Sequence, residues 1–403
     1  MPGEPETPVE LPAPSGPTPE HRRRGLLFVG LAAAGVGFTI TLQLGLNSNF
    51  VAQEMNLSGL QQGLLEMFRE SCGIFALAVL AILSGLAEPL VGAGVLVLFG
   101  LGMASYTFVP TFPWLVAASL VWSQGFHVWV PLPQSMTLAL AEPDRKGHRL
   151  GQVQAAGAIG SGAGLVVALA LSWMKVPIRP LYLLAGGAAI LAAGACLGVP
   201  RKIRTPGPRL VFRRRYGLYY LLSFLEGWRK QISIAFAGFL LVKQYGTPLQ
   251  TMLLLWIAIQ AIGWAASPHV GRLIDRVGER RILVFYFACL TAFFVGYAFV
   301  PVRWVLQAIF IVDGAMFVLA MSLTTYVDRI VPPQERTATL SMGVAVNHVA
   351  AVAMPLVGGL LWKYAGYRWA FAIGAVAAAL SILAALAVPR HVPAPRTTVR
   401  ERD

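Results

Sequence analysis

Long blocks of apolar residues, separated by short polar stretches, run through almost the whole chain. Most blocks have the roughly 20 residues that a helix with a rise of 1.5 Å per residue needs to cross a hydrocarbon layer about 30 Å thick. The pattern therefore predicts an all-α integral membrane protein with twelve transmembrane helices. The predicted helices cover residues 25–46, 59–83, 90–109, 113–140, 150–174, 180–199, 217–241, 250–267, 282–300, 304–326, 338–361 and 369–388.

The composition supports a membrane location. Of the 403 residues, 56% are hydrophobic and only 12% are charged, and the mean hydropathy is +0.65. A soluble domain has about 25% charged residues, so this chain needs the lipid bilayer to cover its apolar surface. The net charge of +14 would suggest a nucleic-acid partner in a soluble protein, but these cations lie between apolar blocks. We therefore expect no nucleic-acid partner.

The positions of the Lys and Arg residues predict the orientation in the membrane. With an even number of helices both termini lie on the same side. If that side is the cytoplasm, 23 of the 32 Lys and Arg residues face inward and six face outward. Positive charge is enriched on the cytoplasmic side of membrane proteins. We therefore expect a multi-pass protein of the cell inner membrane with both termini in the cytoplasm.

Polar and basic stretches divide the chain into two membrane regions. We expect a disordered cytoplasmic tail over residues 1–24, because it is rich in Pro and Glu and poor in large apolar residues. Residues 25–199 form an N-terminal half of six helices, and residues 217–389 form a C-terminal half of six more. The segment 200–216, with seven cations, is predicted to be a cytoplasmic linker, and residues 390–403 a cytoplasmic tail.

The predicted turn between the eighth and ninth helices carries glycines, one aspartate and three arginines at fixed spacing. The residues are Gly271, Asp275, Arg276, Gly278, Arg280 and Arg281. Glycines permit a tight turn, and Asp275 is placed to cap the following helix and to pair with nearby arginines.

This spacing resembles the loop pattern G-x-L-x-D-R-x-G-x-R-R of the major facilitator superfamily (MFS). The resemblance implies two six-helix halves around a central cavity, and a cytoplasmic gate that this cluster latches. In the family the pattern is usually strongest after the second helix, where this chain has Ser84-Gly-Leu-Ala-Glu88-Pro89 without arginines. The resemblance therefore supports a latch in the C-terminal half only.

Ionisable residues inside predicted membrane helices are the main candidates for the functional site, because each is costly to bury in lipid. The seventh helix carries Glu226, Arg229 and Lys230, whose spacing of three and four residues places them on one helical face. The second helix repeats this spacing with Glu66, Arg69 and Glu70, and Glu66 is expected nearer the membrane surface. For Glu226 and Arg229, a structural ion pair is the alternative to a substrate contact.

Five further candidates lie in other predicted helices, and Asp313, Asn347 and His348 have a similar predicted depth. Asp313 lies in the tenth helix, and Asn347 and His348 lie in the eleventh. His127 lies in the fourth helix, one turn after Gln124. We interpret this set as substrate-binding or proton-coupling residues, although a lone histidine such as His127 is also often a packing residue.

These observations favour a secondary active transporter that moves a small solute by alternating access, with protons as the coupling ion. The Arg229 and Lys230 pair suits a carboxylate or phosphate, which points to a small organic anion as substrate. Drug or metabolite efflux by an antiporter of the same fold, and a sensor that binds ligand without transport, remain open.

An enzyme is not expected. The histidines are scattered and form no H-E-x-x-H pair, no nucleophile motif or ATP-binding loop is present, and the three cysteines lie in separate apolar blocks. We therefore expect no catalytic residue, no metal and no cofactor. We also expect a monomer.

Overall fold

The computed structural model describes residues 18–204 and 212–390. Within these ranges the chain is helical, and its only β-type pairing is an isolated bridge between Ala87 and Arg204. The elements are α1 (Pro19–Asn49), the π-helix η1 (Phe50–Glu54), α2 (Gly59–Ile82), α3 (Glu88–Ser105), α4 (Phe112–Trp129), α5 (Leu132–Leu140), α6 (Lys146–Trp173), α7 (Ile178–Cys196), the 3-10 turn η2 (Arg214–Tyr216), α8 (Gly217–Lys243), α9 (Leu249–Val277), α10 (Glu279–Phe299), α11 (Arg303–Met316), the 3-10 turn η3 (Phe317–Ala320), α12 (Met321–Ile330), α13 (Pro333–Ala365) and α14 (Tyr367–Leu386).

Ten of the helical segments are long and apolar enough to cross a membrane. Three of them are composite: α1 and η1 form one segment, α4 and α5 form another, and α11, η3 and α12 form the third. The prediction of an all-α protein with many membrane helices is confirmed. The predicted second and seventh helices exist as α2, with 24 residues, and α8, with 27 residues, but neither is among the ten apolar segments. These two helices carry the charged residues Glu66, Arg69 and Glu70 on α2, and Glu226, Arg229 and Lys230 on α8.

The structure changes several predicted boundaries and leaves others outside the described residues. The predicted eighth helix, 250–267, continues as α9 to Val277, and the predicted eleventh helix, 338–361, is α13, Pro333–Ala365. The first helix begins at Pro19, with Thr18 as its N-cap, and not at residue 25. Residues 20–24 are therefore helical where a disordered tail was expected. Residues 1–17 and 391–403, and residues 205–211 of the linker, lie outside the described ranges, so the predictions for them stay predictions.

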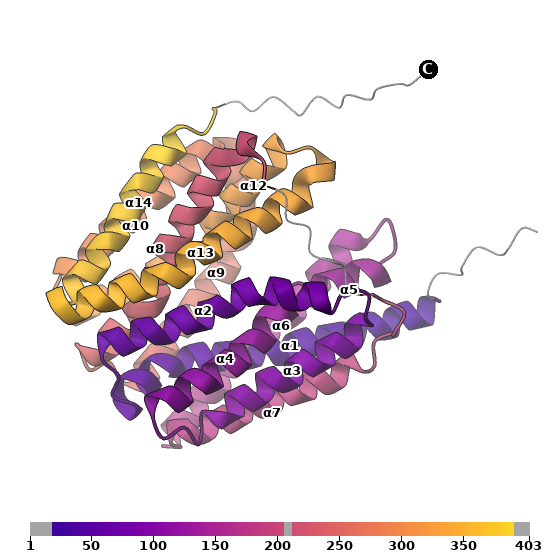
Figure 1. Cartoon of the computed structure of the whole chain (residues 1–403), viewed down its shortest axis with the longest axis horizontal. Helices are drawn as coiled ribbons and strands as arrows, with labels where there is room; N and C mark the ends of the chain where they lie inside the picture. The colour runs from indigo at the N-terminus through magenta and orange to yellow at the C-terminus, as the bar shows by residue number, and fades with distance from the viewer. Residues whose placement is uncertain (1–17, 205–211, 391–403) are drawn as a thin grey trace, which may run out of the picture.

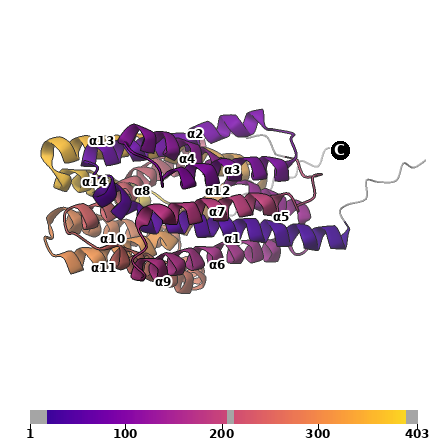
Figure 2. The same ribbon diagram turned by 90° about the horizontal axis from the view of Figure 1, so that it is seen from below.

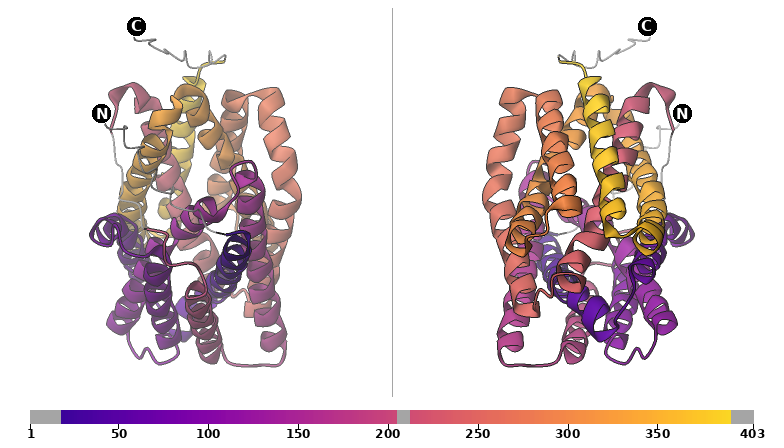
Figure 3. Two further views of the ribbon diagram at one scale, coloured as in Figure 1. Left: turned by 90° about the vertical axis from the view of Figure 1, so that its right-hand side faces the viewer. Right: turned by 90° about the vertical axis from the view of Figure 1, so that its left-hand side faces the viewer.

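The helices pack mainly within two groups, α1–α7 and α8–α14, which we call the N-terminal and C-terminal halves. In the first, α1 packs along α6 and α7, and α3 along α4 and α7; in the second, α8 packs along α13 and α14, and α10 along α14. Figures 1 and 3 show the orange and yellow C-terminal half above the indigo to magenta N-terminal half.

The two halves meet along α2 and α13, which lie side by side in Figures 1 and 2. The contact is a close approach of backbones. A Cβ on Gly63 would collide with the carbonyl oxygen of Pro355 and lie 3.0 Å from the Cα of Gly359, and a Cβ on Gly59 would collide with the ring of Trp362. Small residues let membrane helices approach this closely, so glycines define the line where the halves touch.

Candidate functional site

A buried ionic cluster surrounds Arg229 on α8. Its guanidinium donates hydrogen bonds to the carboxylate of Glu226 one turn earlier and to the hydroxyl of Tyr286 on α10, at 2.7 Å. Its other terminal nitrogen lies 3.8 Å from a carboxylate oxygen of Asp313 on α11. Ser233 donates to the second oxygen of that carboxylate. We call these five residues the Arg229 cluster; it ties α8, α10 and α11 together.

The Arg229 cluster leaves its central cation no access to solvent. The exposed fraction of Arg229 is 0%, and that of Asp313 is 3%. The guanidinium carbon also lies 5.4 Å from the ring centre of Tyr286 and 5.3 Å from that of Phe317. The guanidinium is enclosed by Glu226, Asp313 and Tyr286. This is the geometry of the structural ion pair that the sequence left open as an alternative to a substrate contact.

A second buried pair lies on α2. Arg69 donates to Glu66 at 2.7 Å with the same three-residue spacing as the pair on α8, and its guanidinium carbon lies 4.8 Å from the ring centre of Trp122. Gln62 donates to Glu66 and also to the carbonyl of Ala235 in the C-terminal half, at 2.9 Å. Glu66 was expected near the surface, but it is only 1% exposed, and its carboxylate accepts hydrogen bonds from Gln62 and Arg69.

Three predicted site residues from different helices converge between the halves. These residues are Glu70 on α2, His127 on α4 and His348 on α13. Each has one side-chain nitrogen or oxygen within 4.8 Å of those of the other two, and all three side chains are half-buried. The two imidazole ring centres are 5.6 Å apart with an interplanar angle of 77°. The sequence proposed each of these residues singly, and helix packing brings them together.

Other predicted residues adjoin this centre. The Lys230 ammonium donates to the side-chain oxygen of Asn347 at 3.1 Å, and the Asn347 amide donates to the carbonyl of Ser223 at 3.1 Å. Asn347 immediately precedes His348 on α13, so these bonds connect α8 to the helix that carries His348. Gln124 is half-buried, and its amide nitrogen has no hydrogen-bond partner among the described residues.

Sequence reasoning missed three contributors. Tyr286 and Ser233 complete the Arg229 cluster, but a tyrosine and a serine in apolar helices carry no signal of their own. Gly73 lies on α2 opposite His348. Its position three residues after Glu70 was visible in the sequence, but the histidine that faces it was not.

Comparison with known proteins identifies the family. The chain matches the family model described as Major Facilitator Superfamily over residues 27–333 and 219–403. The chain belongs to the major facilitator superfamily. The resemblance seen in the loop after the eighth predicted helix is therefore confirmed. The chain is a multi-pass membrane protein with the fold of a transporter family.

Solved structures show that the chain has the MFS fold. A mutant form of the nucleoside transporter NupG superposes with a TM-score of 0.76 at 14% identity, and the match covers 90% of this chain and 99% of NupG. A D-xylose-proton symporter superposes with a TM-score of 0.70 at 15% identity, covering 92% of this chain and 97% of the symporter.

One group of curated relatives is similar over a short segment. A protein of Escherichia coli O1:K1 named "Putative multidrug resistance protein MdtD" is 30% identical over 125 residues. The match covers 30% of this chain and spans only 26% of the length of that relative.

The MFS loop pattern lies at the turn between α9 and α10. Gly278 joins the two helices with a φ of +86°, a conformation that favours glycine. The expected cap was wrong: Asp275 lies inside α9, so it does not cap α10, and Gly271 is also within that helix. Asp275 instead lies 3.9 Å from Arg329 at the end of α12, and Glu279 lies 2.8 Å from the same guanidinium.

These contacts hold neighbouring helices of the C-terminal half together. The pairing partner Arg329 comes from α12, 54 positions after Asp275 along the chain. No ion pair involving Arg276, Arg280 or Arg281 occurs within the described part of the chain. We therefore assign the ionic contact of this MFS motif to Asp275 and Glu279 with Arg329.

The halves of this MFS protein are closed against each other at one end. Lys243 at the end of α8 donates to the side chain of Asn56 at 2.6 Å, and Asn49 donates to the carbonyl of Thr247 at 3.0 Å. The Gln62 bond to the C-terminal half lies near this end, and Gln250 on α9 donates to the carbonyl of Ser172 on α6 at 3.2 Å. Hydrogen bonds and glycine contacts thus seal the end that holds the α1–α2 and α8–α9 connections.

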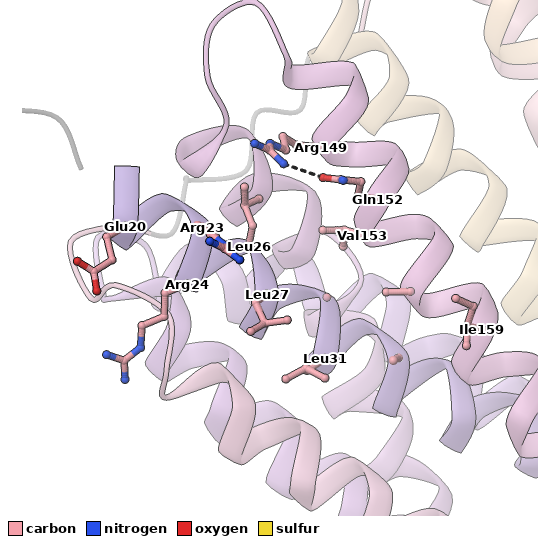
Figure 4. Close-up of a pocket in the computed structure, with 13 residues that line it drawn as sticks. Glu20, Arg23, Arg24, Leu26, Leu27, Leu31, Arg149, Gln152, Val153 and Ile159 are labelled. Carbon is pink, nitrogen blue, oxygen red and sulfur yellow. Dashed lines mark hydrogen bonds between the residues drawn. The ribbon is translucent and has the colours of Figure 1, made fainter. Parts of the chain in front are cut away.

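A cavity of about 730 Å³ lies in the N-terminal half, away from the charged centre. It is formed by α1 and α6, with Arg23, Arg24 and Arg149 around apolar residues that include Leu27 and Ile159. Figure 4 shows these side chains and the 3.0 Å hydrogen bond from Arg149 to Gln152. The cavity is therefore not the cavity between the halves that the MFS resemblance implied.

Proposed function

We propose that this chain is a secondary active transporter that moves a small solute across the inner membrane by alternating access, coupled to protons. Membership of the transporter superfamily supports transport. The observation that carries the mechanism is the meeting of Glu70, His127 and His348 between the halves. We group with them Gln124, one turn before His127, and Lys230, which is bonded to Asn347 next to His348; these six residues are the polar set. Ionisable groups at this depth are costly unless they bind a substrate or ion.

The proposed topology has twelve transmembrane helices, the ten apolar segments together with α2 and α8. Both termini and the linker face the cytoplasm, with halves at residues 25–199 and 217–389. On this topology the sealed end is periplasmic, so the structure corresponds to a state open toward the cytoplasm. Alternating access then requires the Lys243 and Asn49 hydrogen bonds to open.

Within this mechanism we assign substrate binding to the polar set and proton coupling to its titratable members. Lys230 supplies a half-buried cation that is held by a neutral amide, which leaves it able to pair with an anion. A small organic anion is therefore the proposed substrate, and the chain acts as a monomer. The Arg229 cluster and the Glu66–Arg69 pair fix helix positions on either side of this set.

Efflux of a drug or other metabolite is the second candidate function. The segment shared with the relative named as a multidrug resistance protein favours it. The two candidates differ in direction and in substrate, so one assay can separate them.

The test is counterflow in proteoliposomes that contain the purified chain. Vesicles are loaded with one member of a panel of organic anions, sugars, nucleosides or hydrophobic cations, and uptake of the labelled form is measured with and without a pH gradient. Counterflow of an organic anion that a pH gradient accelerates is the expected result. Binding in detergent without counterflow would identify a sensor, and counterflow of hydrophobic cations alone would favour the efflux function.

A further inference from the structure

The cluster of Glu70, His127 and His348 has the donor set of a metal site. Two imidazoles and one carboxylate offer nitrogen and oxygen atoms within 4.8 Å of one another. Zn²⁺ binds the same set of two histidines and one carboxylate in sites that keep a fourth position open. Spacing along the chain offered no reason to expect a metal, because the two histidines are far apart in sequence. Packing of α4 and α13 against α2 brings them together.

Both histidines are held in the tautomer that a metal requires. Nδ1 of His127 lies 2.8 Å from the carbonyl oxygen of Ser123, and Nδ1 of His348 lies 3.0 Å from that of Val344. A carbonyl oxygen only accepts hydrogen bonds, so each Nδ1 carries a proton, and in the neutral ring Nε2 has the lone pair that a metal needs. Metal-binding histidines commonly donate their second nitrogen to a backbone carbonyl in this way.

The carboxylate is also available. Among the described residues Glu70 forms no hydrogen bond or ion pair, because its neighbour Arg69 is paired with Glu66. Lys230 on α8 is bonded to Asn347. A carboxylate without a hydrogen-bond partner beside two imidazoles adds the negative charge that attracts a divalent cation.

Gly73 provides the space for the cluster. A Cβ at this position would overlap Cδ2 and Nε2 of His348 and would lie 3.1 Å from Cδ2 of His127. Any side chain on Gly73 would displace the imidazole of His348. A tetrahedral zinc ion with bonds of about 2.0–2.1 Å holds its ligand atoms about 3.3 Å apart, so small side-chain rotations complete the site.

We propose that Glu70, His127 and His348 form a binding site for a divalent transition-metal ion, with Zn²⁺ as the best-suited ion and a fourth position open to water or another ligand. Two ligands come from the N-terminal half and one from the C-terminal half. A bound ion therefore links the halves and favours the conformation seen here. Inhibition of transport by Zn²⁺ follows, and this consequence alone rests on the proposed function.

The binding test uses the full chain in detergent, with any affinity tag removed and metals stripped by a chelator. Isothermal titration with ZnCl₂ is expected to show one equivalent bound, with no comparable binding of Mg²⁺, which prefers oxygen ligands. Glu70→Gln and His348→Ala should each weaken the affinity at least tenfold. His269→Ala is the matched control, because His269 is exposed and its Nδ1 makes the same type of carbonyl contact, to Ala265 at 3.0 Å.

A second pair of variants tests the site without removing a ligand. Gly73→Ala should abolish Zn²⁺ binding, whereas Gly94→Ala on α3, where a Cβ meets no atom within 4 Å, should leave it unchanged. Size-exclusion profiles establish that each variant is folded. Absence of stoichiometric Zn²⁺ binding in the wild type, or wild-type affinity in His348→Ala and Gly73→Ala, would overturn the proposal. These measurements need no substrate, so they fail or succeed independently of the transport assay.

Discussion

Replacement of Arg229 by alanine tests the energetic role of the Arg229 cluster. The variant leaves two carboxylates, Glu226 and Asp313, without their common cation in a region where both are almost fully buried. Breaking a buried pair by removal of one partner costs about 3–5 kcal/mol. Two carboxylates are stranded here, while Tyr286 and Ser233 still donate to them, so we expect a loss within this range.

The assay is thermal unfolding of the purified protein in detergent, together with the yield of monodisperse protein. Arg229→Ala should sharply lower both. The double variant Glu226→Ala with Arg229→Ala should recover much of the loss, because only Asp313 is then unpaired. Arg145→Ala is the control, because Arg145 lies 4.0 Å from Asp144 and both side chains are exposed, and surface pairs contribute about 0–1 kcal/mol.

The same variants decide between the two interpretations of Arg229. The sequence favoured a ligand contact, and the complete burial of the guanidinium shifts our expectation to a structural pair. If Arg229→Ala unfolds at the wild-type temperature but loses substrate binding, the reasoning from burial is refuted and the ligand contact is correct. Failure of the double variant to recover any stability would show that Glu226 is not the group that the arginine stabilises.

Three other predictions concern the side that we propose to be cytoplasmic. Asp275→Asn should slow counterflow more than it weakens substrate binding, because Asp275 contacts Arg329 at a proposed gate; an equal loss of binding would contradict that role. A cysteine introduced at Gly207 should react with a membrane-impermeant reagent only from the cytoplasmic side, and periplasmic labelling would refute the topology. The hydrogen bond from Arg215 lowers the pKa of Glu335 below its ordinary value of 4.5. The pair of Arg215 with ionised Glu335 therefore stabilises the folded protein above pH 4.5, and this stabilisation is lost as the pH falls through the lowered pKa. The difference in melting temperature between wild type and Glu335→Gln should therefore disappear on acidification. A difference that grows at low pH would contradict the predicted direction of this pH dependence.

The sequence predicted the helices well because each helix is encoded locally. A block of about 20 apolar residues satisfies its own backbone hydrogen bonds and covers itself with lipid. Small boundary errors occurred where polar residues extend a helix into water, as at Pro19–Arg24 of α1. The charged α2 and α8 were also found, because their apolar residues flank the charges on both sides.

The partners within the site were harder to predict because they come from distant helices. The spacing within α8 indicated the Glu226–Arg229 pair, and the spacing within α2 indicated Glu66 and Arg69. The addition of Asp313 and Tyr286 to the first pair depends on how α10 and α11 pack. Likewise, the meeting of His127 with His348 depends on the contact between the halves, and no periodicity in one helix encodes it.

The line of glycines between α2 and α13 bears on how fast the protein can change state. Where Gly63 meets Pro355 and Gly359, backbone packs directly on backbone, and in the proposed mechanism one helix can move on the other there without unpacking side chains. The activation barrier for exchange between states then comes mainly from the hydrogen bonds at the sealed end. Larger residues along this line would change the rate of exchange between conformations more than they would change the affinity for any ligand.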